Sequence, residues 1–142
     1  MSDHLARFRQ SAYLAQSGRC FYCGLPMWVR DPESFAASHG MTPSQARVFQ
    51  CTAEHLEARK DGGQDTKRNI VAACFCCNQR RHKRKQAPDP DDYRLLVQQR
   101  LTKGRWHPQS LASLLLLDHA QPVVNTPYAY SALSRQERIL SC

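Results

Sequence analysis

Residues 51–82, CTAEHLEARKDGGQDTKRNIVAACFCCNQRRH, carry most of the chemically distinctive residues of the chain. The acid–histidine pair Glu54-His55 is followed by the glycine pair Gly62-Gly63 and then by Asn69. A Cys-x-x-Cys motif, Cys74–Cys77, leads into a strongly basic segment. The rest of the sequence is most simply interpreted as support for this stretch, or as a means of bringing it to a polyanion.

The same stretch predicts two short strands and a helix. Residues 47–53 and 69–73 are largely apolar and favour strands, with Glu54-His55 at the end of the first. The segment between them, residues 57–68, is polar and contains the two glycines, which is typical of a connecting loop. In an extended strand the side chains of Glu54 and His55 point to opposite faces, but a bend at the strand end can bring both near one site. A basic helix is expected to begin at Cys77-Asn78.

The flanking segments predict mainly helices. Leu5, Phe8, Ala12 and Ala15 are spaced as on one face of a helix over residues 3–16. Residues 25–42 appear irregular, with a short helix beginning near Thr42-Pro43. Towards the C-terminus, one helix is expected from a cap at Asp91 or Asp92 to Gly104, and another from Pro108.

The length of 142 residues fits one compact domain. We expect this domain to span residues 1–120, with its core at 18–85 and C-terminal helices at 91–120, followed by a tail at 121–142. No apolar run approaches the roughly 20 residues that a membrane span needs. The segment MSDHLARFRQ lacks the apolar core of a secretory signal. A cytoplasmic protein without a membrane partner is therefore expected.

The charge of the chain favours a polyanionic partner. Twenty lysines and arginines face 12 acidic residues, which gives a formal net charge of +8. Phosphate binding gains from counterion release, so a nucleic acid is a natural partner, although many small basic proteins bind none. Eight basic residues, counting His82, lie between Lys67 and Lys85.

The cysteines predict a metal site. Two Cys-x-x-Cys pairs, Cys20/Cys23 and Cys74/Cys77, offer four thiolates to a structural zinc ion. A redox-active Cys-x-x-Cys is the rival interpretation, and Cys76 could compete for the fourth position. Because fifty residues separate the pairs, the metal would join distant segments and contribute directly to folding.

Four residues around the second pair suit hydrolytic chemistry. A carboxylate such as Glu54 binds hard divalent cations, and an imidazole such as His55 serves as a general base. Asn78 offers an oxygen to the same cation, and His82 lies four residues later on the same helix face. A simpler interpretation is also open: Glu54-His55 could be a surface acid–histidine pair and the helix a solvated basic face. Composition alone, without the order of the residues, favours this simpler interpretation.

The order and spacing of these motifs resemble the HNH endonuclease family, the ββα-metal nucleases. Glu54-His55 matches the acid–His pair, Gly62-Gly63 the loop, and Asn69 the middle asparagine. The motif Cys74-x-x-Cys77-Asn78 matches the closing motif, and Cys20-x-x-Cys23 the usual zinc partner pair. The resemblance covers roughly residues 18–85. It implies an α+β fold with a small ββα-metal (His-Me finger) core and a four-cysteine zinc site, flanked by N-terminal and C-terminal helices.

The resemblance also implies a role for each matched residue. His55 would be the general base that activates water, and Asn69 would stabilise the loop that orients it. Glu54, Asn78 and His82 would hold one catalytic divalent cation, Mg²⁺ or a similar ion. Cleavage of DNA, expected to be double-stranded, would leave a 5′-phosphate and a 3′-hydroxyl.

The sequence departs from the family pattern at three positions. Ala58 stands where many members have proline, and Glu54 where many have aspartate or histidine. Asn78 is a weaker ligand than histidine, so His82 is either a ligand or a phosphate contact. The residues expected to contact nucleic acid are Lys67, Arg68, Arg80, Arg81, Lys83, Arg84 and Lys85.

Three functions remain open on these observations. The first is a metal-dependent DNA endonuclease with a structural zinc. The second is a non-catalytic, zinc-stabilised DNA-binding module, and the third is a structural or protein-interaction domain. The joint presence of Glu54, His55, Asn69 and Asn78 favours the first, because the other two need only the cysteines and the basic helix.

Overall fold

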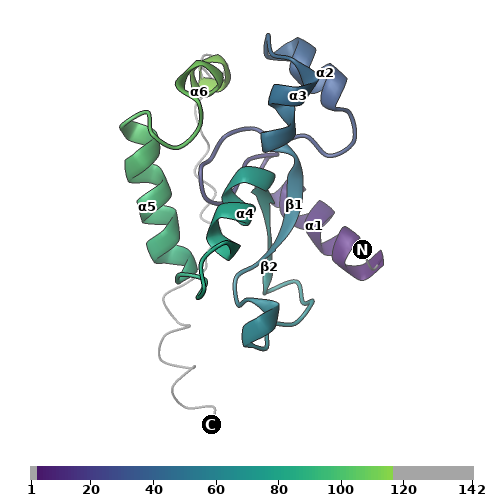
Figure 1. The fold of residues 1–142 in the computed structure, drawn as a ribbon. Coiled ribbons are helices and arrows are strands. Elements are labelled where there is room, and N and C mark those ends of the chain that lie inside the picture. Colours follow the sequence, from purple (N-terminus) through teal and green to yellow (C-terminus); the bar gives the residue numbers. More distant parts are fainter. Residues whose placement is uncertain (1–2, 117–142) are drawn as a thin grey trace.

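A two-stranded antiparallel hairpin lies at the centre of the fold in the computed structural model, which describes residues 3–116 (Figure 1). Strand β1, Cys51–His55, pairs with β2, Ile70–Cys74, so that Cys51 lies opposite Cys74 and His55 opposite Ile70. Helix α4, Phe75–His82, begins directly after β2. The predicted α+β architecture with a ββα core is therefore confirmed.

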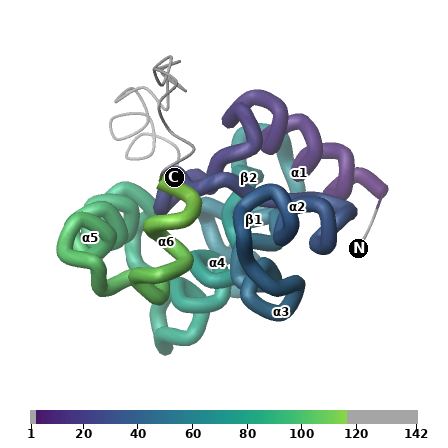
Figure 2. The backbone as a smooth tube through the Cα atoms, turned by 90° about the horizontal axis from the view of Figure 1, so that it is seen from above, coloured from purple at the N-terminus to yellow at the C-terminus, as the bar shows by residue number. Residues whose placement is uncertain are grey.

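Helix α1, Asp3–Ala15, packs against both strands of the hairpin. In both views the hairpin lies between α1 and α4 (Figures 1 and 2). Gln16, just after α1, bonds with the outer edge of β2: its Nε2 donates to the Ala72 carbonyl and its Oε1 accepts from the Ala72 amide. A glutamine side chain thus satisfies backbone groups that an edge strand would otherwise leave open.

The segment before β1 is more helical than the sequence predicted. Helix α2, Pro32–Ser38, lies in the stretch expected to be irregular. Its signal was the sequence Asp31-Pro32-Glu33: the Asp31 side chain accepts from the Ser34 amide, and proline occupies the first turn. Helix α3, Pro43–Ala46, begins with the expected Thr42 cap.

The predicted strand at residues 47–53 is wrong in its first half. Arg47–Phe49 continue from α3 as a 3₁₀ helix, and β1 begins only at Cys51. Phe49 is fully buried there, and the Trp28 indole donates to the Ala46 carbonyl. The strand also runs through Glu54 and His55 in regular pairing. The pairing shows no bend at this strand end, so the two side chains leave opposite faces of the strand.

Helices α5, Pro90–Thr102, and α6, Gln109–Leu116, follow α4 (Figure 1). The cap of α5 is Asp89, whose side chain accepts from the amides of Asp91 and Asp92; the predicted caps lie two or three residues too late. Proline at the first helical position, Pro90, explains this start. Within the core, the Tyr22 and Tyr93 rings meet edge to face with centroids 4.9 Å apart.

None of the helices within residues 3–116 is long and apolar enough to cross a membrane. The predicted tail at residues 121–142 and the last four residues of the predicted helical region, 117–120, lie outside the described residues.

His107 is an uncharged residue of the core. It is 4% exposed, and its ring packs on Phe49 with centroids 5.0 Å apart. Neither ring nitrogen has a hydrogen-bond partner among the described residues. Burial lowers the pKa of His107 to about 4, well below the value of about 6.5 in an unfolded chain. The contribution of neutral His107 to stability is therefore complete above about pH 6.5 and is lost as the pH falls towards about 4.

We expect His107→Phe to weaken the acid sensitivity of the fold. Between pH 7 and pH 5 the free energy of unfolding should fall by about 2 kcal/mol less in this variant than in the wild type. Urea unfolding at the two pH values measures this difference, and His4→Gln, at an exposed histidine of α1, is the control. Equal acid sensitivity in wild type and His107→Phe would contradict the assignment.

Candidate active site and metal centres

Four cysteines form one buried cluster. Cys20 and Cys23 come from the turn after α1, Cys74 ends β2, and Cys77 lies in the first turn of α4. Their sulfur atoms all lie within 4.8 Å of one another, and the Cys23 and Cys74 sulfurs are 3.9 Å apart. A tetrahedral zinc ion with bonds of about 2.3 Å needs sulfurs about 3.8 Å apart. The four thiols therefore fit such an ion.

Hydrogen bonds to sulfur support this cluster. The Cys74 amide donates to Cys20 Sγ, the Cys77 amide to Cys74 Sγ, and the Trp106 indole to Cys77 Sγ. Although burial opposes it, hydrogen bonds with the other three cysteines lower the pKa of Cys20 well below its usual range. Donors of this kind orient metal ligands and stabilise thiolates.

Cys76 takes no part in the cluster. Its sulfur is outside the group of four, and burial raises the pKa of its thiol to about 11. It therefore remains a protonated thiol at neutral pH. The meeting of two Cys-x-x-Cys pairs at one point also favours a metal site over a redox-active pair, since each pair supplies two of the four ligands of one tetrahedral site.

Glu54 is the centre of a second polar site. It is 1% exposed, and its side chain leaves β1 towards α4. Oε1 accepts from the Tyr22 hydroxyl at 2.8 Å and from Arg81 Nη1 at 2.6 Å. Oε2 lies 3.0 Å from His82 Nε2, on the last residue of α4. One oxygen of the carboxylate is thus used by the fold, while the other faces a histidine.

Arg81 is an internal residue, and its predicted contact with nucleic acid is wrong. Its side chain is 2% exposed. Besides Glu54, the guanidinium donates to the carbonyls of His55, Leu56 and Pro88. A buried carboxylate needs a charged partner, and the inward face of α4 supplies one. In the sequence Arg81 is one of a run of basic residues, so its burial could not be distinguished from the exposure of its neighbours.

Glu54 and His82 fit two adjacent ligands of a divalent cation. Ligands at about 2.1 Å in an octahedral site lie about 3.0 Å apart when they are neighbours, which matches the observed separation of Oε2 and Nε2. Asn78, one turn earlier, uses its Nδ2 to donate to Thr52 Oγ1 and the Ala53 carbonyl, which leaves its Oδ1 as the potential ligand. Its assignment as a ligand stays a prediction.

Among residues 3–116, the four cysteines are the one group of three or more His, Cys, Asp or Glu side chains able to hold a metal ion. The Glu54–His82 pair therefore has no third strong ligand of these types. Mg²⁺ tolerates this well, since it retains water and takes phosphate oxygens from its substrate.

His55 points away from this pair, towards the loop after β1. Its Nε2 lies 2.7 Å from Asp65 Oδ1. A contact this short with a carboxylate requires the proton on Nε2, so the 3.2 Å approach of Arg59 Nε to the same nitrogen is not a second hydrogen bond to a lone pair. In a neutral imidazole Nδ1 then carries the lone pair, and it makes no hydrogen bond with any described residue. His55 is thus arranged as a base at Nδ1.

Asn69 and the glycine pair shape the loop beside His55. Asn69 Oδ1 accepts from the Glu57 amide, and its Nδ2 donates to the carbonyls of Glu57 and Gln64. A Cβ at Gly63 would lie 1.8 Å from the Glu57 carbonyl oxygen, so no other residue fits there, and Gly62 has φ +98°. Asn69 therefore joins the two ends of the loop.

Residues 44–84 match the HNH endonuclease family model. The predicted resemblance is confirmed for this HNH segment, and the match indicates a nuclease-type function. The segment runs from α3 to just beyond α4, so Cys20 and Cys23 lie outside it. Searches of curated proteins and of solved structures gave no significant match to the chain.

Most of the basic residues of the HNH segment are exposed. Lys67 and Arg68 lie on the loop before β2, and Lys83, Arg84 and Lys85 follow α4. Arg80 is also exposed, but its guanidinium lies 4.7 Å from the centre of the Trp106 ring and donates to the Trp106 carbonyl. The predicted nucleic-acid contacts other than Arg81 stay predictions.

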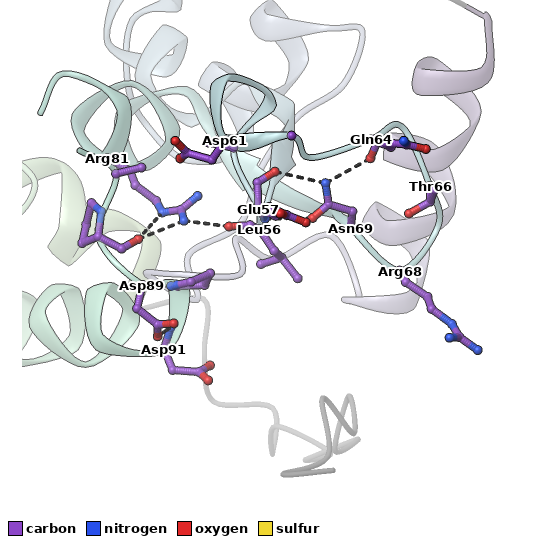
Figure 3. A pocket seen from close by; sticks show the side chains of 15 residues that line it. Leu56, Glu57, Asp61, Gln64, Thr66, Arg68, Asn69, Arg81, Asp89 and Asp91 are labelled. Atoms are coloured by element: carbon purple, nitrogen blue, oxygen red, sulfur yellow. Dashed lines mark hydrogen bonds between the residues drawn. The ribbon is translucent and has the colours of Figure 1, made fainter. Parts of the chain in front are cut away.

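An open groove of about 1020 Å³ lies beside the loop that joins β1 to β2, residues 56–69. Leu56, Asn69 and Arg81 are among the residues that line it (Figure 3). Its lining includes the carboxylates of Glu57, Asp61, Asp89 and Asp91, and it includes none of Glu54, His55 and His82. Figure 3 shows the Arg81 guanidinium occupied by backbone carbonyls. These four carboxylates repel phosphate, while Arg68 is the one cation among the described lining residues whose guanidinium is not already bonded to backbone carbonyls.

Sequence reasoning missed three residues of the site: Tyr22, Arg59 and Asp65. Tyr22 lies inside the first Cys-x-x-Cys motif, which places its hydroxyl beside Glu54. Asp65 had a weak signal, an acid two residues after the glycine pair. Arg59 had none, since it resembles any exposed arginine of a polar loop.

We expect Cys23→Ser to lower the melting temperature by about 10 °C or more, because loss of one thiolate weakens a metal site that contributes folding free energy. Thermal unfolding and the zinc content of the purified protein measure this. Cys76→Ser, beside the cluster but outside it, is the matched control and should retain both. A melting temperature unchanged in Cys23→Ser would exclude a structural role for that thiol.

Proposed function

We propose that the protein is a metal-dependent endonuclease that hydrolyses phosphodiester bonds of DNA. The observation that carries this proposal is the approach of Glu54 Oε2 and His82 Nε2 to 3.0 Å, with the histidine that follows Glu54 in β1, His55, leaving one ring nitrogen without a described partner. A divalent cation site and a general base are the two groups that this hydrolysis requires. The HNH match supports the same reaction class.

Glu54 and His82, with Asn78 as the weaker third ligand, would hold the catalytic cation. Mg²⁺ or a similar cation would supply stabilisation of the negative charge that develops on the phosphate and the leaving oxygen. Arg81 and Tyr22 keep Glu54 Oε1 occupied and thereby direct Oε2 towards His82. The four cysteines would hold zinc and would take no part in the chemistry.

His55 would act as the general base. Its Nδ1 would accept the proton of the attacking water, while Nε2 keeps its own proton in the bond to Asp65. Asn69 would limit the movement of the loop that carries Asp65. As the family resemblance implies, the products would be a 5′-phosphate and a 3′-hydroxyl.

Double-stranded DNA is the substrate that we propose. The net charge of +8 and the exposed basic residues before β2 and after α4 favour binding through phosphates. The buried free thiols suit a reducing compartment, so we also propose a cytoplasmic location.

A non-catalytic DNA-binding module is the second candidate. It would use the same cysteines and the same exposed lysines and arginines. It gives no reason, however, for a buried glutamate that pairs with a half-exposed histidine as well as with Arg81, because a buried carboxylate costs stability unless it is used. The endonuclease accounts for this feature.

We expect the zinc-loaded protein to convert supercoiled plasmid to nicked or linear DNA only when Mg²⁺ or Mn²⁺ is added. His55→Ala should lower the cleavage rate by at least about 100-fold, because general base catalysis contributes roughly 10²–10⁴-fold. Gel analysis of the plasmid over time measures both. Zinc content and DNA binding of His55→Ala should equal those of the wild type.

Full cleavage by His55→Ala would contradict the assignment of the base. Tight, salt-sensitive DNA binding by the wild type without cleavage in either metal would instead support the binding module.

We expect His82→Ala to raise the Mg²⁺ concentration needed for half-maximal cleavage by about tenfold or more, since it removes one of two strong ligands. Lys83→Ala, at the next residue, should leave this concentration unchanged and reduce DNA affinity and its salt dependence. Mg²⁺ titrations of plasmid cleavage compare the two variants. An unchanged requirement in His82→Ala would make His82 a phosphate contact.

A further inference from the structure

Asp65 makes the shortest polar contact of the proposed base. It lies in the loop between the glycine pair and Asn69, and its Oδ1 is 2.7 Å from His55 Nε2. We propose that Asp65 is the positioning residue of His55, holding the imidazole so that Nδ1 faces the substrate. This inference rests on the endonuclease function proposed above.

The contact determines both the tautomer and the orientation of the ring. A neutral imidazole carries one proton, and the carboxylate holds that proton on Nε2. The ring can then rotate only by breaking a charge-assisted hydrogen bond, which is stronger than a bond between neutral groups. Nδ1 is left unprotonated and without a protein partner, as a base must be before it accepts a proton from water.

Asp65 is itself held from two directions. Arg59 Nη2 donates to both carboxylate oxygens at 2.8 Å, which sets the plane of the carboxylate. The backbone just before Asp65 is restrained by Asn69, which donates to the Gln64 carbonyl, and by the close approach of Gly63 to Glu57. The hydrogen bond with His55, followed by the bonds with Arg59, lowers the pKa of the Asp65 carboxyl. Asp65 is thus an anion at neutral pH.

Asp65 is not an additional metal ligand. Within the described part of the chain, no group of three metal-binding side chains contains Asp65, Glu54 and His82. The two carboxylates instead lie on opposite sides of β1: Glu54 faces α4, and Asp65 faces the ring of His55. His82 is therefore paired with Glu54 at the proposed cation site, and His55 is paired with Asp65 at the proposed base.

Asp61 provides a matched control. It lies in the same loop and is exposed, so Asp61→Ala removes the same charge from the same loop. Any general effect of that charge on DNA approach should appear equally in Asp61→Ala and Asp65→Ala. An effect of Asp65 on His55 should appear only in the latter.

Plasmid cleavage at saturating Mg²⁺ by the zinc-loaded full chain tests the proposal. We expect Asp65→Ala to lower kcat by about 10- to 100-fold relative to Asp61→Ala, with KM within about twofold, as expected for loss of a residue that orients a reacting group. Asp65→Asn should also lose kcat at an unchanged melting temperature. Its amide can accept from Arg59 and fill the same space, but its N–H₂ can face His55 and retain the proton on Nδ1.

A second readout needs no cleavage. In a proton–nitrogen NMR spectrum of zinc-loaded protein without Mg²⁺ or DNA, the His55 ring should show an Nε2–H protected from exchange, identified by its loss in His55→Ala. This signal should disappear in Asp65→Ala and persist in Asp61→Ala.

Wild-type kcat in Asp65→Asn, or equal kcat in Asp65→Ala and Asp61→Ala, would overturn the positioning role while leaving the nuclease intact. Failure of the wild type to cleave in either metal would overturn the function, even if the NMR signal showed that Asp65 holds His55.

Discussion

The four-cysteine cluster is the constraint on which the remaining structure depends. It joins the turn after α1 to the point where β2 becomes α4, across fifty intervening residues. Cys74 and Cys77 sit at that junction, so a metal ion held there sets the angle at which α4 leaves the hairpin. The Trp106 indole bonds to the same cluster and couples it to the C-terminal helices. The direction of α4 in turn decides which of its side chains reach Glu54.

A buried carboxylate then organises the interior of the site. Glu54 accepts from Tyr22 and Arg81 at one oxygen and faces His82 with the other. The nearly full burial of Glu54 and Arg81 makes the ion pair costly to break, since either charge alone would be left without water or a partner. This arrangement presents one carboxylate oxygen in a defined direction before any cation binds. Such preorganisation is what a metal site on a small scaffold needs.

Alternation along β1 separates the two kinds of chemistry. Because neighbouring residues of a strand point to opposite faces, Glu54 reaches α4 while His55 reaches the loop. The proposed cation site is thus formed with α4, and the proposed base is positioned by the loop between β1 and β2. This loop is shaped by Gly63, whose lack of a side chain allows close packing on Glu57, and by Asn69, which joins the loop ends. The groove beside that loop is lined by four carboxylates and by none of Glu54, His55 and His82.

The sequence by itself identified the ββα unit and the two cysteine pairs, and it selected Glu54, His55, Asn69 and His82 as candidates. Their fixed spacing and residue types can be recognised before the fold is known. The prediction erred on residues 47–49, where local propensity gave way to packing of Phe49, and on helix α2, whose local start signal at Asp31-Pro32 was missed. Only the tertiary structure decided which basic residues are internal. Arg81 is buried and its neighbours are exposed because helix α4 turns a single face to β1, and a run of similar charges carries no sign of that face. The pairing of Asp65 with His55 was equally hidden, since it depends on the path of a polar loop that no periodicity describes.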